Sequence, residues 1–362
     1  MQRLNVLIKP ASSSCNMRCQ YCFYEDVSKN RQVKNFGIMK QDIMKGMIDH
    51  IFEDKELQIV HFAFQGGEPT LAGIDFFREF ISYVKLKQKN IEVSYSIQSN
   101  GYSLDNEWFN LFKENEFLVG ISLDGFQNNH DMLRFDNQNN GTFSSVIKTI
   151  KKLQEMHISY NILTVLTKQL AKSPEKLYTF YKNNKFQYIQ FIPCLPRFGC
   201  QEDEFSLTPE LFYSFYKKLY VLWKEDFLQG RYMSIALFDN IMAICCKESP
   251  SQCGFVGQCQ IQYVIESQGN VYPCDFYVLD EYCLGNIVKD NLNLMNQHPH
   301  AHHFLNNNVL PQKCKECKYL KICYGQCKRQ RQSFMNENIC GYQRLLDDIL
   351  KDMIQLVPYF MS

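Results

Sequence analysis

The stretch Cys15-Asn16-Met17-Arg18-Cys19-Gln20-Tyr21-Cys22 places three cysteines within eight residues. Three thiolates can wrap one small cluster, and a four-iron cube held by only three of them keeps one iron open for another ligand. An open position likewise separates catalytic zinc sites from closed structural ones. From its spacing alone, the stretch predicts either such a cluster or a zinc site whose fourth ligand comes from elsewhere.

Around this stretch, residues 4–195 alternate between short apolar segments and helical ones. The expected strands are Leu4–Ile8, Ile59–Phe64, Val93–Gln98, Leu118–Ser122, Tyr160–Leu166 and Tyr188–Pro193. The expected helices are Lys40–Phe52, Phe76–Leu86, Glu107–Glu116, Phe143–Glu155, Pro174–Lys182 and Pro209–Gln229. Such alternation predicts βαβ units with a parallel sheet, and six units predict an open partial barrel. Function in such barrels collects in the loops after the strands, where the cysteine stretch lies.

The length of 362 residues fits one barrel-sized domain and a smaller one. From about residue 240, cysteines and glycines replace the strand–helix rhythm. We therefore expect the α/β barrel in residues 1–235 and a small cysteine-rich domain with a C-terminal helix in residues 236–362.

Charge and hydropathy exclude several classes of partner. Lys+Arg number 39 and Asp+Glu 38, so nothing favours a nucleic-acid or anionic-membrane partner. No apolar run reaches the roughly 18 residues of a membrane span. The first ten residues lack the apolar core and cleavage site of a secretory signal, so we expect a cytoplasmic protein.

Sixteen cysteines are unusual for a chain expected in the reducing cytoplasm, where metal ligation is a better explanation than disulfides. Eight of them form patterned groups in the second half of the chain, enough for two clusters with four cysteine ligands each, or for two closed zinc sites. The eight are Cys253, Cys259, Cys274, Cys314, Cys317, Cys323, Cys327 and Cys340. Five others fit no pattern and are interpreted as ordinary thiols: Cys194, Cys200, Cys245, Cys246 and Cys283.

Polar or glycine-rich loops follow three further predicted strands. Phe64-Gln65-Gly66-Gly67-Glu68-Pro69 comes after the second strand, and its two glycines allow a close approach of the backbone that a side chain would prevent. Gln98-Ser99-Asn100-Gly101 and Ser122-Leu123-Asp124-Gly125 end the third and fourth strands. Each loop alone is typical of an ordinary turn, but all three lie where a barrel site is expected.

The first cysteine stretch, with Tyr21 just before its third cysteine, resembles the signature of the radical S-adenosylmethionine superfamily. The resemblance implies a partial (β/α)6 barrel in which the open iron binds S-adenosylmethionine, whose cleavage yields a 5′-deoxyadenosyl radical. It implies that Tyr21 lies against the adenine and that Gly66, Gly67 and Glu68 hold the amino group of the cofactor. It also implies that Ser122 and Arg134 contact polar groups of the cofactor and that Leu195 contacts the adenosine.

The later cysteines resemble the SPASM domain, which follows the barrel in many peptide-modifying radical enzymes. This resemblance implies two interleaved auxiliary [4Fe-4S] clusters, hence three clusters in all. The first auxiliary set would be Cys253, Cys259, Cys274 and Cys327. The second would be Cys314, Cys317, Cys323 and Cys340. With four protein ligands each, neither auxiliary cluster would have an open iron. Both would then serve electron transfer and architecture.

Several longer stretches resemble the anaerobic sulfatase-maturating enzymes. They include Leu7-Ile8-Lys9-Pro10-Ala11-Ser12-Ser13, Phe62-Ala63-Phe64-Gln65-Gly66-Gly67-Glu68-Pro69 and Val271-Tyr272-Pro273-Cys274-Asp275-Phe276. Such enzymes oxidise a Cys or Ser of a sulfatase to Cα-formylglycine. The resemblance implies that Asp275 is the catalytic base and that Tyr24 and Gln65 hold the substrate. It also implies an unfolded or nascent sulfatase polypeptide as substrate, and flavodoxin or ferredoxin as electron donor.

Two rival interpretations remain open from the sequence. One is another SPASM-type enzyme that cross-links or epimerises a peptide; such enzymes often carry an N-terminal peptide-recognition domain, for which the 14 residues before Cys15 leave no room. The other is a zinc-binding protein without catalysis. A formylglycine product would exclude the first rival, and brown iron–sulfur colour would exclude the second.

Overall fold

The computed structural model describes residues 2–360, which form two compact units. The first unit runs to Ser122 and adds Asp131–Tyr160 and Gln260–Asn307. The second contains Leu123–His130, Asn161–Cys259 and the chain from Asn308 onward. Both units therefore draw on the N-terminal and the C-terminal parts of the sequence, and the boundary expected near residue 235 stays a prediction.

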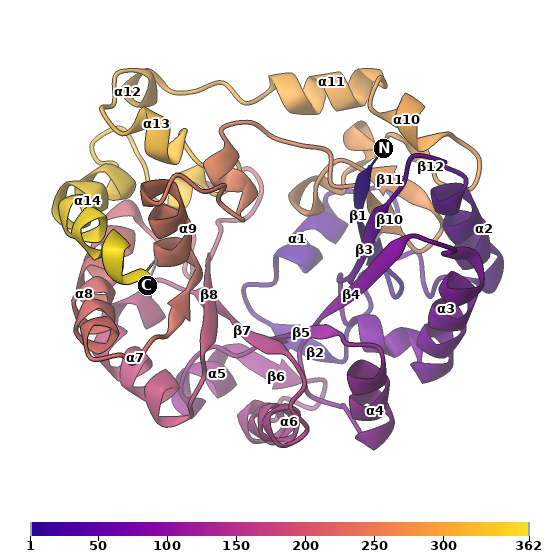
Figure 1. Cartoon of the computed structure of the whole chain (residues 1–362), viewed down its shortest axis with the longest axis horizontal. Coiled ribbons are helices and arrows are strands. Elements are labelled where there is room, and N and C mark those ends of the chain that lie inside the picture. Colours follow the sequence, from indigo (N-terminus) through magenta and orange to yellow (C-terminus); the bar gives the residue numbers. More distant parts are fainter. Residues whose placement is uncertain (1, 361–362) are drawn as a thin grey trace. The chain divides into compact units, whose positions relative to one another are not determined.

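Seven neighbouring strands of a longer sheet form the centre of the first unit, in the order β12-β11-β10-β1-β3-β4-β5 (Figure 1). The strands from the N-terminal part are β1 (Arg3–Lys9), β3 (Ile59–Phe64), β4 (Glu92–Ser99) and β5 (Leu118–Ser122). The strands from the C-terminal part are β10 (Val264–Glu266), β11 (Asn270–Tyr272) and β12 (Gly285–Asn286). Neighbours from β10 to β5 are parallel, whereas β10, β11 and β12 pair antiparallel.

Amphipathic helices cover this sheet, and the core between the helices and the sheet is largely aromatic. They are α2 (Gln41–Phe52), α3 (Ile74–Lys87), α4 (Asn106–Glu114) and α6 (Phe143–Glu155). Phe62 and Phe64 of β3 point to the same face because side chains alternate along a strand. There they pack edge-on against Phe80 of α3, with ring centroids 5.1 and 5.0 Å away. All three rings are buried, so this contact fixes α3 on the sheet.

Short elements complete the first unit. The strands β2 (Met17–Cys19) and β6 (Arg134–Asp136) form a separate antiparallel ribbon. The helical segments are α1 (Phe23–Lys29), η1 (Pro69–Ala72), η4 (Asp275–Tyr277), η5 (Asp280–Tyr282), α10 (Leu292–Met295) and α11 (Pro299–Asn306). The helix α5 (Gln127–Leu133) contains residues assigned to each of the two units.

The second unit contains the parallel strands β7 (Tyr160–Leu166), β8 (Tyr188–Pro193) and β9 (Ser234–Ile235). Two 20-residue helices, α8 (Pro209–Leu228) and α14 (Gly341–Phe360), pack against each other, with the rings of Phe212 and Tyr342 4.8 Å apart. The other helices are α7 (Pro174–Asn183), α9 (Ala236–Cys245), α12 (Gln312–Lys315) and α13 (Leu320–Cys323). Short 3₁₀ turns are η2 (Leu170–Lys172), η3 (Cys253–Val256) and η6 (Arg331–Ser333). No helix within residues 2–360 is long and apolar enough to cross a membrane.

Candidate functional site

The segment between β1 and α1 carries the first three cysteines, with Cys19 at the end of the short strand β2. The backbone N–H of Met17 donates to Cys15 Sγ at 3.4 Å, and the N–H of Cys22 donates to the Cys19 carbonyl at 3.1 Å. Cys22 also forms the N-cap of α1. Burial raises the pKa of the Cys15 thiol to about 11, and iron ligation would replace its proton. Three soft thiol donors in this segment suit the three-ligand cluster expected from the sequence.

A two-stranded ribbon brings Arg134 to this loop. Cys19 of β2 lies opposite Arg134 of β6, whose Nη1 donates to the Tyr21 hydroxyl at 3.1 Å. Arg134 is buried. Burial raises the pKa of the Cys22 thiol, and the Arg134 guanidinium acts in the opposite direction. Arg134 and Tyr21, both predicted cofactor contacts, are therefore neighbours at the cysteine loop.

The two glycines of the second motif pack against the cysteine loop itself. The N–H of Gly67 donates to the Ser12 carbonyl at 2.9 Å, and the N–H of Glu68 donates to the Ser14 carbonyl at 2.8 Å. A Cβ on Gly67 would lie 2.1 Å from the Ser14 oxygen, and one on Gly66 would lie 2.8 Å from the Ser12 oxygen. The close approach expected of this pair is thus made to backbone just before Cys15.

We predict that Gly67→Ala disrupts the first cysteine loop, because its methyl would overlap backbone that no side-chain rotation can clear. The expected destabilisation is about 1–3 kcal/mol, as in other overpacked sites, with loss of iron and 5′-deoxyadenosine formation. Denaturant unfolding and iron analysis on anaerobic protein measure both. Gly73→Ala is the control. The φ of 88° at Gly73 makes a side chain there unfavourable, but an added Cβ meets nothing within 4 Å. Equal radical formation in both variants would contradict this role of Gly67.

The side chain of Glu68, in the loop after β3, bonds to residues at the end of β4. Its carboxylate is almost fully buried and accepts from Ser99 Oγ at 3.0 Å and from the N–H of Asn100 at 2.7 Å. Burial raises the pKa of this carboxyl, and these hydrogen bonds oppose the shift. The side chain of Asn100 reaches the cysteine loop, with Nδ2 2.8 Å from Asn16 Oδ1 and 3.8 Å from Cys15 Sγ. The loop after β4 therefore joins the cysteine loop, as its place at a strand end suggested.

Asp275 lies in a three-residue cluster with Lys9 and Tyr24. Lys9 Nζ is 2.8 Å from Asp275 Oδ1, and the Tyr24 hydroxyl donates to Oδ2 at 2.7 Å. Lys9 Nζ also lies 4.5 Å from the centroid of the Tyr24 ring. The exposed fractions of the Lys9 and Asp275 side chains are only 3% and 13%. The cluster joins β1, α1 and η4, and the sequence interpretation gave no role to Lys9.

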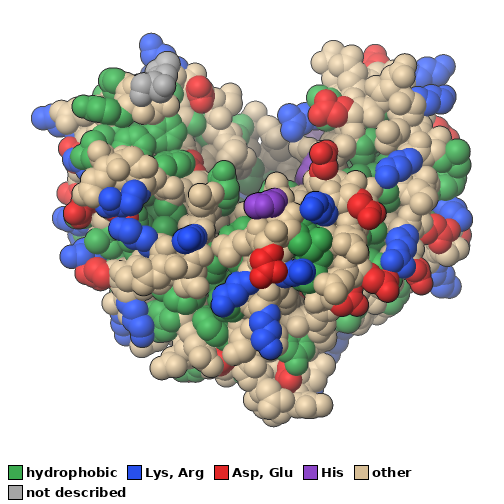
Figure 2. All heavy atoms as spheres, turned by 60° about the horizontal axis from the view of Figure 1, so that its bottom comes forward, with side chains coloured by type: hydrophobic (Ala, Val, Ile, Leu, Met, Phe, Trp, Pro, Cys, Tyr) green, Lys and Arg blue, Asp and Glu red, His purple; other side chains and the backbone are tan. Residues whose placement is uncertain are grey.

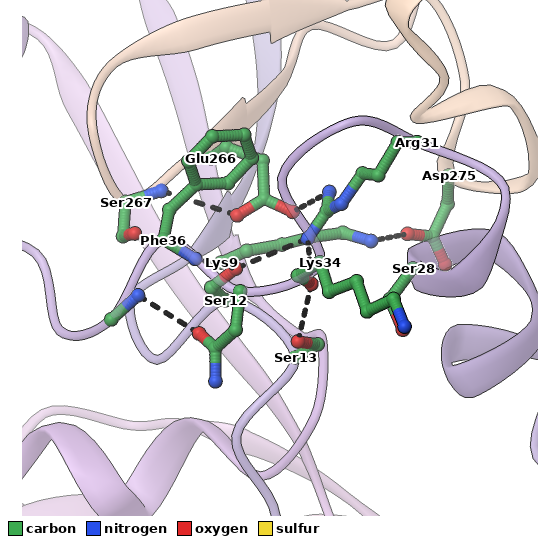
Figure 3. A network of polar contacts seen from close by, with 12 residues as sticks. Lys9, Ser12, Ser13, Ser28, Arg31, Lys34, Phe36, Glu266, Ser267 and Asp275 are labelled. Carbon is green, nitrogen blue, oxygen red and sulfur yellow. Dashed lines mark hydrogen bonds and ion pairs between the residues drawn. The ribbon is translucent and has the colours of Figure 1, made fainter.

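A second buried ion pair lies beside this cluster (Figure 3). Arg31 Nη1 is 2.6 Å from Glu266 Oε1, and each side chain is 2% exposed. Arg31 Nη2 also donates to Ser12 Oγ at 3.2 Å. Ser12 adopts a left-handed φ of 51°, which is uncommon outside glycine and requires support from its surroundings. The pair thus holds a strained residue three positions before Cys15.

The second auxiliary set of cysteines meets in one place. Cys314, Cys317, Cys323 and Cys340 line a single hollow. Met335 supplies a further sulfur, 3.7 Å from Cys314 Sγ. Four thiols around one space form the all-sulfur donor set that iron–sulfur clusters use. Within residues 2–360, no three His, Cys, Asp or Glu side chains form a site for a single metal ion.

The first auxiliary set divides between the units. Cys253, Cys259 and Cys327 belong to the second unit, and Cys274 to the first. Burial, then the neighbouring thiols of Cys327 and Cys259, raise the pKa of Cys253 to about 11, so these three are close together. None of the sixteen cysteines, all of which lie within residues 2–360, forms a disulfide, including the five without an assigned role.

The remaining predicted contacts stay untested by this geometry. Ser122 is buried at the end of β5, and Gln65 Nε2 donates to Gln98 Oε1. Leu195 follows β8 and is half-buried in the second unit.

Comparisons with known proteins agree with this architecture. The family model of the radical SAM superfamily matches residues 10–181, and that of an iron–sulfur cluster-binding domain matches residues 253–318. A cysteine-type anaerobic sulfatase-maturating enzyme of Clostridium novyi is 44% identical over 92% of this chain and 90% of its own. A serine-type enzyme of Bacteroides thetaiotaomicron is 29% identical over 98% and 90%. A solved structure of anSMEcpe with bound AdoMet and Cp18Cys peptide covers 99% of both chains at 35% identity, with a TM-score of 0.90.

Proposed function

Because the chain belongs to the anaerobic sulfatase-maturating enzymes of the radical S-adenosylmethionine superfamily, we propose that it oxidises a cysteine of a sulfatase polypeptide to formylglycine with Asp275 as base. The partial barrel and cluster-binding domain expected from the sequence are confirmed by this membership. The observation that carries the proposal is the half-buried Asp275 carboxylate, which adjoins Cys274, a predicted cluster ligand. The greater identity to the cysteine-type relative supports cysteine as the target.

When bound, the first cluster and S-adenosylmethionine supply the 5′-deoxyadenosyl radical that removes a hydrogen atom from the target Cβ. The substrate radical then loses one thiol proton and one electron, which an auxiliary cluster would accept; water adds to the resulting thioaldehyde, and hydrogen sulfide leaves to give the aldehyde. Asp275 accepts the proton. Lys9 stabilises the carboxylate, and the Tyr24 hydroxyl orients it. A carboxylate has about four lone pairs and these two contacts use two, so capacity remains for the substrate proton.

The other residues of the site prepare the cysteine loop and the cofactor. Gly66, Gly67 and Glu68 fix the backbone before Cys15, and Arg134 places a positive charge beside its thiols. Tyr21, Ser122 and Leu195 are proposed as further cofactor contacts, and Gln65 as a substrate contact. The electron donor, flavodoxin or ferredoxin, and a cytoplasmic location also remain proposals.

We predict faster formylglycine formation from a Cys-type than from a Ser-type sulfatase peptide. A thiol proton is more acidic than a hydroxyl proton, so a carboxylate base removes it more readily. Anaerobic incubation of both peptides with S-adenosylmethionine and dithionite, followed by mass spectrometry, gives the ratio. A cross-link or epimer without aldehyde would refute the maturase assignment, and a preference for serine would refute only the target.

A further inference from the structure

The buried pair of Arg31 and Glu266 is unusual among the charges of this chain. Charged side chains of both signs lie on the face drawn in Figure 2, where water solvates them. Arg31 and Glu266 are each only 2% exposed, and Nη1 of the arginine is 2.6 Å from Oε1 of the glutamate. The attraction within a buried pair often fails to recover the free energy lost when two charges leave water. Stability is therefore a weak reason for this pair, and its other contacts indicate a different role.

Three further contacts of the Arg31 guanidinium lie in one neighbourhood (Figure 3). Nη2 donates to Ser12 Oγ at 3.2 Å and to the Lys34 carbonyl at 3.0 Å, and the centroid of the Phe36 ring is 4.8 Å from Cζ. The backbone N–H of Phe36 donates to the same Ser12 hydroxyl at 3.2 Å. Residues 31–36, which we call the brace, thus fold around the guanidinium and bring two donors to one hydroxyl oxygen.

The brace also bonds to the other two serines before Cys15. Ser13 Oγ donates to the Lys34 carbonyl at 2.8 Å, and Asn35 Nδ2 donates to Ser14 Oγ at 2.9 Å. Both bonds span 21 positions of the sequence, so the loop receives this support from a distant segment and not from its own residues. All three serine side chains before the first cysteine are therefore held by one segment.

The brace supports an unfavourable backbone conformation at Ser12. The φ of Ser12 is 51°, and such a left-handed conformation is disfavoured about 5–30-fold for a residue with a side chain. The Ser12 carbonyl accepts the N–H of Gly67 at 2.9 Å, and the Ser14 carbonyl accepts that of Glu68 at 2.8 Å. A turn of Ser12 to an ordinary conformation would redirect these carbonyls. The conformation of Ser12 therefore decides how the backbone before Cys15 meets the glycine pair.

We propose that Arg31 is a positioning residue of the radical site, which acts through Ser12 to hold Cys15 where the first cluster forms. The proposal rests on the proposed function, which assigns Cys15 to the cluster that cleaves S-adenosylmethionine. Glu266 on β10 orients the guanidinium, so a strand from the C-terminal part of the chain helps to fix the first cysteine. Without the brace, the loop before the cysteine opens more often, and the site can lose iron while the loop is open.

The test replaces both members of the pair by apolar residues of similar size. Arg31→Met/Glu266→Leu leaves no lone charge buried, and such replacements are often neutral for stability. It removes the Arg31 donor to Ser12, so hydrogen–deuterium exchange at the amides of Gly67 and Glu68 in the anaerobic holoenzyme should rise about fivefold or more. An iron chelator should abolish 5′-deoxyadenosine formation faster by a similar factor, because both processes pass through the open loop. The midpoint of denaturant unfolding should stay at the parent value.

The matched control is Arg78→Met/Glu107→Leu, which removes the same two charges from the same unit. The charged atoms of this pair are 2.8 Å apart, but the side chains are 50% and 60% exposed. Exchange at the two amides and resistance to the chelator should equal those of the parent.

Two variants of Ser12 test the step through the backbone. Ser12→Ala and Ser12→Gly both remove the hydroxyl that the brace holds, but only glycine adopts a left-handed φ without strain. Exchange at the amides of Gly67 and Glu68 should therefore rise more in the alanine variant than in the glycine variant. Equal exchange in the two variants would overturn the proposed action through Ser12.

Parent exchange and parent resistance to the chelator in Arg31→Met/Glu266→Leu would overturn the proposal. Faster exchange throughout the unit with a lower unfolding midpoint would also overturn it, because the pair would then only stabilise the fold. If this variant does not fold, Arg31→Lys replaces it, since lysine keeps the charge opposite Glu266 but has no planar fork to reach Ser12 as well. Parent behaviour of Arg31→Lys overturns the proposal equally. Failure of the proposed function looks different: a parent that cleaves S-adenosylmethionine but forms no aldehyde would refute that function alone.

Discussion

Replacing Cys15, Cys19 and Cys22 together by Ala should abolish 5′-deoxyadenosine formation while about eight of about twelve iron atoms remain bound. The reason is that all three thiols lie within eight residues between β1 and α1, whereas eight other cysteines are assigned to the auxiliary sites. Those of the second auxiliary set lie together in another unit. Iron analysis and quantification of 5′-deoxyadenosine on the same anaerobic sample measure the two effects.

The chain offers a matched control for this variant. Cys200, Cys245 and Cys246 belong to none of the three sets, so their triple replacement by Ala should keep full iron and full cofactor cleavage. Cofactor cleavage that persists without Cys15, Cys19 and Cys22 would refute the radical site. Stoichiometric zinc in the parent would refute the iron assignment altogether.

Asp275→Asn should uncouple the two products of the reaction. Asp275 is not among the ligands assigned to the first cluster, so cofactor cleavage should survive. Formylglycine should fall about 10²–10⁴-fold, which is typical for loss of a general base. Asn keeps an oxygen for the Tyr24 hydroxyl but removes the charge that pairs with buried Lys9. The measurement is the ratio of 5′-deoxyadenosine to aldehyde, together with iron content.

Asp280→Asn provides the comparison. Asp280 also lies in a short 3₁₀ turn and accepts the N–H of Gln32 at 2.7 Å, a bond that Asn can keep. Its ratio of products should equal that of the parent. If Asp275→Asn forms aldehyde at the parent rate with full iron, another group is the base. A parallel loss of both products and of iron would mark Asp275 as structural.

The sequence predicted the regular part of the fold well. Ile59–Phe64, Leu118–Ser122, Tyr160–Leu166 and Tyr188–Pro193 are strands with the expected bounds, and Phe143–Glu155 is a helix as expected. Each is a strongly apolar or amphipathic segment whose period decides its structure locally. The irregular pattern after residue 240 gave no hint that β10 joins the parallel strands beside β1. Its three residues are too few for a periodic signal.

The sequence predicted those parts of the site that form short motifs. It did not predict contacts between residues that are far apart in the chain. The cysteine spacing and the glycine pair are visible within a few residues. The pairs Lys9–Asp275 and Arg31–Glu266 join residues more than two hundred positions apart, for which a single sequence contains no signal. Lys9 alone offered a clue, since it is a charged residue at the carboxyl end of an apolar strand, where barrel sites lie.

The parallel pairing of β1 with β10 has a consequence for the order in which the chain is made. Leu7, Ile8 and Lys9 pair with Val264, Ile265 and Glu266. At the usual 5–20 residues per second, on the order of tens of seconds separate the synthesis of the two strands. During that interval one edge of β1 is bare, and a bare edge invites pairing with other chains. The unpaired edge of β1 in the nascent protein therefore has to be protected from other chains until the C-terminal third has been synthesised. The cysteine loop that follows β1 reaches its final structure late.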